Sequence, residues 1–166
     1  MVSDMIVGEL LPEQGEVILD GVAAADCEVG KAGVIQGNGG MISNLKVWEN
    51  ITLPGWYHAA KQKRKMEEVV AKWLGVLVPD VTDWERFMAS PVGKLRNSER
   101  KLAGIMRMLV TAPDLLVLDA ALFDEVEEAK ATRWREVIEQ YQGENPARAV
   151  LALCHQGTRL PWAKVE

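Results

Sequence analysis

The stretch Leu115-Leu116-Val117-Leu118-Asp119 is an uninterrupted apolar run that closes on a carboxylate. Such a run between two helical patterns is typical of a buried parallel strand. Asp119 then lies at the carboxyl end of that strand, the edge where open parallel sheets place their ligands. The run therefore predicts an α/β fold with a site beside Asp119.

Further strands and helices alternate around this run. Short apolar pieces predict strands at residues 15–21, 33–35 and 149–154. Apolar spacings of three and four predict helices at residues 59–77, 79–89, 98–109 and 125–141, the third of them capped by Asn97 or Ser98. A mixed segment at residues 44–53 is closed by Pro54-Gly55. The alternation predicts a parallel sheet covered by helices.

The length and charge of the chain limit its domain organisation and its possible partners. The chain has 166 residues, enough for one domain that spans residues 1–166. A net charge of −5 repels a phosphate backbone, so we expect no nucleic-acid partner. Cys27 and Cys154 are too few for a disulfide framework and are expected to be small, buried or half-buried side chains. No signal peptide or bilayer-spanning run is evident, which predicts a cytoplasmic location, with any membrane association through a partner.

Five segments resemble, in the family's order, parts of the ATP-binding domain of ABC transporters. They are residues 8–21 (the segment after the P-loop helix), Val34-Ile35-Gln36 (the Q-loop), residues 95–109 (the signature motif and its helix), residues 115–119 (the Walker B strand) and Cys154-His155-Gln156 (the switch-histidine loop). The resemblance covers almost the full chain. It implies a P-loop NTPase-like, ABC ATPase-like parallel sheet that is truncated at its N-terminus and carries a helical subdomain at about residues 41–94.

The chain departs from the family where the chemistry lies. It contains no glycine-rich loop followed by Lys and Ser/Thr, the segment that would cradle phosphates, and the alignment places Met1 inside the helix that such a loop opens. Ala120 stands where the family has its catalytic glutamate, and a methyl group cannot activate water. The signature Ser-Gly-Gly corresponds to Arg96-Asn97-Ser98, and the D-loop aspartate to Val126. We therefore expect no catalytic residues and no ATP hydrolysis by this chain alone.

The resemblance nevertheless implies ATP and Mg²⁺ as cofactors and assigns positions to them. Gln36, Asp119, His155 and Ser98 would contact the nucleotide, with Gln36 and Asp119 also near the metal. Each position has a structural alternative, because a carboxylate at a strand end also caps the next turn and His155 can be a hydrogen-bonded structural imidazole. Gln36 can equally be a polar loop residue.

The resemblance also implies partners. A transmembrane permease would be contacted through residues 36–58, where Trp48, Trp56, Tyr57 and His58 are the interface candidates. The missing P-loop strand is expected to leave a gap beside residues 115–119, covered by another copy, a partner subunit or a rearranged strand at residues 16–19. A homo- or hetero-oligomer follows from that expectation.

Three functions remain open at this point. The first is a degenerate, non-hydrolysing component of a membrane transport assembly. The second is a structural or regulatory interaction protein that binds no nucleotide. The third is the larger part of an active transport ATPase whose P-loop lies on sequence that precedes Met1.

Overall fold

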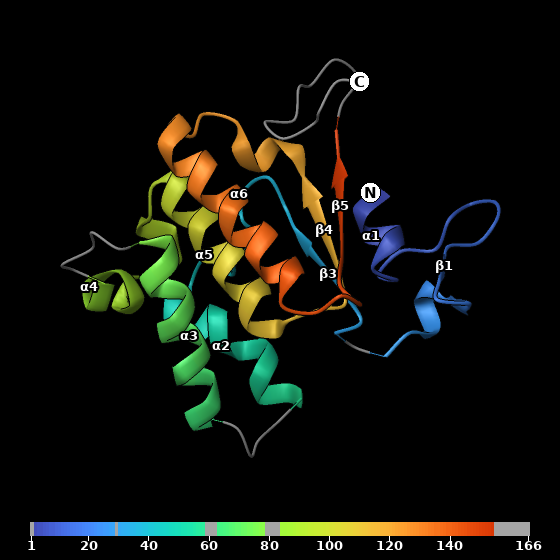
Figure 1. Ribbon diagram of the computed structural model, residues 1–166, viewed down its shortest axis with the longest axis horizontal. Coiled ribbons are helices and arrows are strands. Elements are labelled where there is room, and N and C mark those ends of the chain that lie inside the picture. The colour runs from blue at the N-terminus through green and yellow to red at the C-terminus, as the bar shows by residue number, and fades with distance from the viewer. Residues whose placement is uncertain (1, 29, 59–62, 79–83, 155–166) are drawn as a thin grey trace.

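A three-stranded parallel sheet organises the chain (Figure 1). The computed structural model describes residues 2–28, 30–58, 63–78 and 84–154. The strands β3 (Ala32–Ile35), β4 (Leu115–Asp119) and β5 (Ala149–Leu153) lie in the order β3-β4-β5. Ile35 pairs with Leu118 and Asp119 with Leu153, so the three carboxyl ends share one edge. The predicted α/β fold and the strand that ends on Asp119 are both confirmed.

Helices cover the sheet and extend away from it. In Figure 1, α5 and α6 lie over one face of the sheet, whereas α1 contacts β3 and β4 from the other side. The helices are α1 (Val2–Ile6), α2 (Val47–His58), α3 (Lys63–Leu77), α4 (Trp84–Ala89), α5 (Asn97–Thr111) and α6 (Glu128–Gly143), with short 3₁₀ turns η1 (Ala24–Asp26), η2 (Val92–Lys94) and η3 (Ala120–Phe123). Helices α2 to α4 fall within residues 41–94, whose status as a separate subdomain stays a prediction.

The core lies between β4 and the helices. Leu116, Val117 and Leu118 are fully buried, as an apolar strand flanked on both sides requires. Trp73 of α3 and Trp134 of α6 are also buried, as their helical spacing predicts. These large side chains connect the sheet to α3 and α6 in a single apolar cluster.

Several helix boundaries differ from the sequence predictions, and α6 covers Glu128–Gly143 instead of residues 125–141. Helix α5 begins at Asn97, so its N-cap is Arg96, whose backbone N–H donates to Glu99 Oε2 at 2.7 Å. The predicted caps Asn97 and Ser98 are therefore wrong, because Glu99 reaches back and places the helix start earlier. The short helix expected at residues 79–89 is present from Trp84, and residues 79–83 lie outside the described part.

Pro54 does not close the segment that contains it. Helix α2 runs through Pro54, because Val47 and Ile51 are completely buried and hold the helix to the core. The buried Asn50 side chain accepts from Ile42 N at 2.7 Å and donates to Lys46 O at 3.1 Å, which anchors the helix start. Tertiary packing thus overrides the local break predicted at Pro54-Gly55.

The expected gap beside β4 does not exist. Strand β4 is the central strand, with β3 on one side and β5 on the other. The rearranged strand expected at residues 16–19 is wrong as well, because β1 (Ile18–Leu19) pairs with β2 (Val22–Ala23) in a separate antiparallel hairpin. Within the described sheet, the strands with one unpaired side are β3 and β5.

Candidate functional site

The carboxyl edge of the sheet brings two predicted site residues together. Gln36 follows β3 and Asp119 ends β4, and Gly37 N donates to Asp119 Oδ2 at 3.3 Å. Cys154 follows β5 at the same edge, and its side chain is exposed, unlike the burial expected for it. His155 lies outside the described residues. The edge therefore holds one carboxylate and the loop of Gln36, side by side.

Both carboxylate oxygens of Asp119 accept backbone hydrogen bonds. Oδ1 accepts from Ala121 N at 3.0 Å and thereby caps η3, while Oδ2 accepts from Gly37 N. Asp119 therefore connects the turn after β4 to the loop after β3. This is the capping role that the sequence left open as an alternative. Ala120, next in the chain, is 5% exposed and presents only a methyl group.

The glycine-rich loop at residues 37–40 packs directly on α5. A Cβ on Gly39, whose φ is +89°, would lie 2.3 Å from Arg100 O, and one on Gly104 would lie 2.5 Å from Gly39 O. Arg107 Nη1 donates to Gly40 O at 2.7 Å and closes the contact. Backbone groups of this loop therefore face a helix. Gln36, which precedes the loop, is exposed.

Lys101 is a functional-site neighbour that the sequence reasoning missed. It is 3% exposed, and its ammonium donates to Ala121 O at 2.8 Å and Asp124 O at 2.7 Å. Burial lowers the pKa of Lys101, while the nearby acidic groups, Asp124 first among them, oppose that shift. The signal was present, because Lys101 precedes Ile105 by four residues and so lies on the buried stripe of α5.

Arg107 of α5 is half-buried and donates to the loop at residues 37–40. Burial lowers its pKa, and the charge of Glu9 opposes that shift. The buried Nε atoms of Arg100 and Arg107 have no hydrogen-bond partner within the described structure. The loop at residues 37–40 is thus held to α5 by Arg107, whose charge interacts with that of Glu9.

The other residues that the sequence analysis singled out lie outside the Asp119 edge of the sheet. Ser98 is half-buried in the first turn of α5, and Val126 packs against the core. Trp48 is half-buried against the core rather than fully presented to a partner. Trp56, Tyr57 and His58 belong to α2, and their side chains lie outside what the structure describes. The interface role of these four residues stays a prediction.

The described residues supply only part of what a MgATP site needs. The oxygens of Asp119 are engaged by amides, and the described ranges contain no group of three or more His, Cys, Asp or Glu side chains able to hold a metal. No segment of the sequence has the glycine-rich Lys-Ser/Thr pattern. Nor does any helix in the described part have the length and apolar character to cross a bilayer.

Comparison with known proteins shows which sequences and folds the chain resembles. No family model matches the chain. The probable ribonucleotide transport ATP-binding protein mkl of Mycobacterium tuberculosis is 26% identical over 121 residues, which are 69% of this chain and 32% of mkl, and mkl of Mycobacterium leprae is equally identical over 33% of its length. The chain thus spans about a third of the length of these relatives.

Solved structures agree with the sequence relatives. The dimeric ATP-binding cassette MJ0796, bound to ADP and Pi, superposes with a TM-score of 0.72 at 18% identity, over 93% of this chain and 68% of that one. The ATP-binding subunit of an ABC transporter superposes with a TM-score of 0.76 at 15% identity, over 93% and 62% of the two chains. The chain therefore has the fold of an ABC ATP-binding domain, and its sequence is related to transport ATP-binding proteins.

Proposed function

We propose that this chain is a non-hydrolysing component of an ABC-type transport assembly. In that role it would lie at the cytoplasmic face of a membrane and contact a transmembrane permease through residues 36–58. Its sequence relatives are named as transport ATP-binding proteins, which supports a transport role. An oligomer is part of the proposal, and the dimeric state of the similar MJ0796 supports it.

The observation that carries the proposal is the pair of side chains at the end of β4 and directly after it. Asp119 is engaged by two backbone amides, and the next residue, Ala120, is a buried methyl group. Ala120 has no group that can take a proton from an attacking water, and both oxygens of Asp119 already accept backbone hydrogen bonds. The side chains of Arg96, Asn97 and Ser98 occupy the start of α5, where a nucleotide would need close approach to backbone amides. Both features favour an ATPase fold that has lost turnover.

The engaged carboxylate also favours a second candidate, an interaction protein that binds no nucleotide. If Asp119 serves only as a cap, the fold would act as a scaffold for a protein partner. Gln36, Ser98 and His155 would then have no nucleotide role. The two candidates differ in one measurable property, which is affinity for ATP.

Titration calorimetry of the full chain with ATP, into the millimolar range and with and without Mg²⁺, tests the proposal. We expect saturable binding that needs Mg²⁺ and weakens in Asp119→Asn, which keeps one acceptor oxygen for the Ala121 amide. Ser98→Ala is the second variant, because it alters the start of α5 without touching the cap of η3. No binding would reject the transport-component proposal in favour of the scaffold.

Phosphate release tests the loss of turnover separately. We expect the wild-type chain and Asp119→Asn to release phosphate from ATP at the same background rate. A wild-type rate clearly above that of the variant would contradict the non-hydrolysing role. Since binding and turnover are measured independently, one result can fail without the other.

A further inference from the structure

Charge is distributed unevenly along the chain. Residues 1–30 carry seven acidic side chains and no Lys, Arg or His. All 19 basic side chains and the other 17 acidic ones follow residue 30. We call the part formed by residues 2–28 the N-terminal lobe. It comprises α1, the hairpin β1–β2 and η1, and Figure 1 shows it at one side of the sheet. The lobe is therefore strongly acidic on a molecule whose remainder is nearly neutral.

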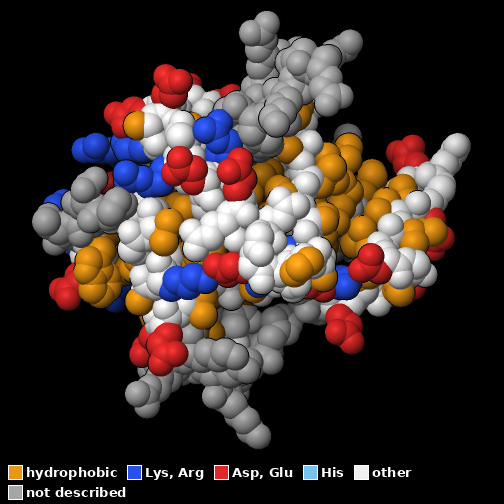
Figure 2. Space-filling view, viewed as in Figure 1, with side chains coloured by type: hydrophobic (Ala, Val, Ile, Leu, Met, Phe, Trp, Pro, Cys, Tyr) orange, Lys and Arg blue, Asp and Glu red, His pale blue; other side chains and the backbone are white. Residues whose placement is uncertain are grey.

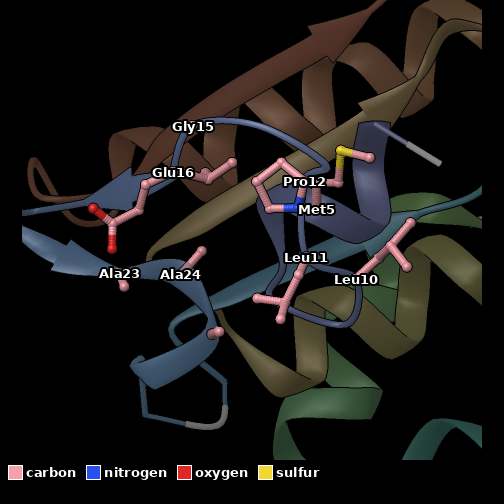
Figure 3. Close-up of a pocket in the computed structure, with 10 residues that line it drawn as sticks. Met5, Leu10, Leu11, Pro12, Gly15, Glu16, Ala23 and Ala24 are labelled. Carbon is pink, nitrogen blue, oxygen red and sulfur yellow. The ribbon is translucent and has the colours of Figure 1, made fainter.

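The N-terminal lobe also holds an apolar groove of about 320 Å³. Met5, Leu10, Leu11 and Pro12 form one side of it, and Glu16, Ala23 and Ala24 form the other (Figure 3). Leu10 is 44% exposed and Leu11 71% exposed, so the groove opens to solvent beside large apolar side chains. Ile18 and Val22 of the hairpin add further exposed apolar surface. Apolar surface gathered around a groove marks a binding site more often than scattered exposed residues do.

Four carboxylates belong to the groove lining or lie next to it in the chain. Glu9 precedes Leu10, Glu13 follows Pro12, Glu16 belongs to the lining, and Asp26 follows Ala25. The side chains of Glu9, Glu13, Glu16 and Asp26 are exposed. In Figure 2, acidic groups lie around the hydrophobic ones of this lobe. Lys31, at the boundary of the lobe, is held by Asp20 at 3.0 Å and Asp114 at 2.9 Å, away from the groove lining.

We propose that this groove docks a segment of a partner protein in which Lys or Arg side chains flank large apolar ones. The apolar walls would bury the large side chains, and the carboxylates would attract the basic ones. An amphipathic helix with leucines on one face and lysines beside them has this chemistry. An anionic membrane surface does not, because the carboxylates repel it. The proposal is independent of whether the chain binds ATP.

The first test uses the full chain and a fluorescent 18-residue helical peptide of leucine and lysine. We expect saturable binding by anisotropy at low salt, which weakens as salt is raised. A peptide with glutamate in place of lysine is expected not to bind. Absence of saturable binding, or equal binding of both peptides, would overturn the proposal.

Matched variants locate the binding surface. Glu13→Gln with Glu16→Gln removes two charges at the groove and is expected to weaken the peptide about fivefold or more, whereas Glu136→Gln with Glu139→Gln removes two exposed charges on α6 and should change it less than about twofold. Equal effects of the two pairs would overturn the proposal, because they would show attraction to the net charge alone.

A leucine variant tests the apolar part. Leu11→Ser is expected to weaken binding of the peptide, and Ile42→Ser, at a 44% exposed apolar side chain outside the groove, is its control. Circular dichroism checks that both variants fold. Two further outcomes would overturn the choice of partner: binding of the wild-type chain to anionic phospholipid vesicles, or a dimer that sedimentation detects and Leu11→Ser dissociates. The latter would identify a second copy of the chain as the occupant.

Discussion

The sheet core buries its large apolar side chains, whereas the N-terminal lobe leaves large apolar side chains exposed. In the core, strand β4 and helix α5 bury Leu116, Leu118, Ile105 and Met106 completely. In the N-terminal lobe, Ala24 is the one buried residue among residues 2–28, while large apolar side chains such as Leu11 remain exposed. The core is therefore stabilised by packing, whereas the lobe has little packing of its own.

This contrast separates the residues that determine the fold from those available for binding. In a region that buries its apolar side chains, these side chains stabilise the fold, so substitutions there mainly lower the free energy of unfolding. A region that leaves apolar side chains exposed among carboxylates can lose them at little cost to folding. We therefore expect stability to depend on the core and partner binding on the N-terminal lobe.

The largest effect on the free energy of unfolding should come from truncating a side chain in the core. Leu118→Ala removes a fully buried side chain from the central strand and is expected to lower the free energy of unfolding by about 2–5 kcal/mol. The same change in the lobe, Leu11→Ala at 71% exposure, should alter it by less than about 0.5 kcal/mol. Urea unfolding of both variants measures the difference. Similar losses would mean that the lobe is packed as tightly as the core.

The contact between the glycine-rich loop and α5 gives the next largest effect. Gly104→Ala places a Cβ 2.5 Å from Gly39 O and is expected to cost about 1–3 kcal/mol. Gly75→Ala is the control, because it is also in a helix but has open space around its Cβ, and should stabilise by about 0.5–1 kcal/mol. Thermal unfolding that ranks the two variants the other way would show that the loop is not packed on α5.

The buried side chain of Tyr141 is expected to make the stability of the core depend on pH in the alkaline range. Burial raises its pKa to about 12, and its hydroxyl donates to Pro113 O. The folded state thus holds the phenolic proton more tightly than the unfolded chain, whose ordinary value is 10.0. This contribution is fully present below pH 10 and is lost as pH rises toward 12.

Tyr141→Phe tests that contribution. The variant should unfold with about 1 kcal/mol less free energy at pH 7, since one buried hydrogen bond is lost. It should also lose less stability than the wild type between about pH 10 and 12, because phenylalanine has no proton to release. Urea unfolding at several pH values compares the two proteins. Parallel curves would show that Tyr141 does not titrate with unfolding.

The sequence predicted the core better than the site. The sequence predicts strand β4 from end to end, because four consecutive apolar residues followed by an aspartate, between two helical patterns, fit few structures other than a buried strand. The buried faces of Trp73 and Trp134 followed from helical spacing alone. These features depend on local pattern, which a sequence displays directly.

The remaining features depend on long-range contacts. Pro54 lies inside α2 because Ile51 and Val47 are held by the core, and this burial overrides the local break signal of Pro54-Gly55. Strand order is equally non-local, so the sequence did not show that β5 pairs directly with β4 and leaves no gap there. Lys101 reaches carbonyls about twenty residues away, at Ala121 and Asp124. Contacts of this kind need the folded arrangement before they can be identified.

The smallest predicted effect concerns the charges of the N-terminal lobe. Glu13→Gln with Glu16→Gln removes two exposed carboxylates from a region without basic side chains. Relief of like-charge repulsion should raise the free energy of unfolding slightly, by less than about 0.5 kcal/mol at low salt. The gain should vanish at about 0.5 M salt, where the Debye length falls below typical separations between surface charges. Urea unfolding at both salt concentrations checks this, with Glu136→Gln and Glu139→Gln as the control pair near basic residues of α6. A clear loss of stability would show that the carboxylates hold the lobe together, and they would then be unavailable for a basic partner.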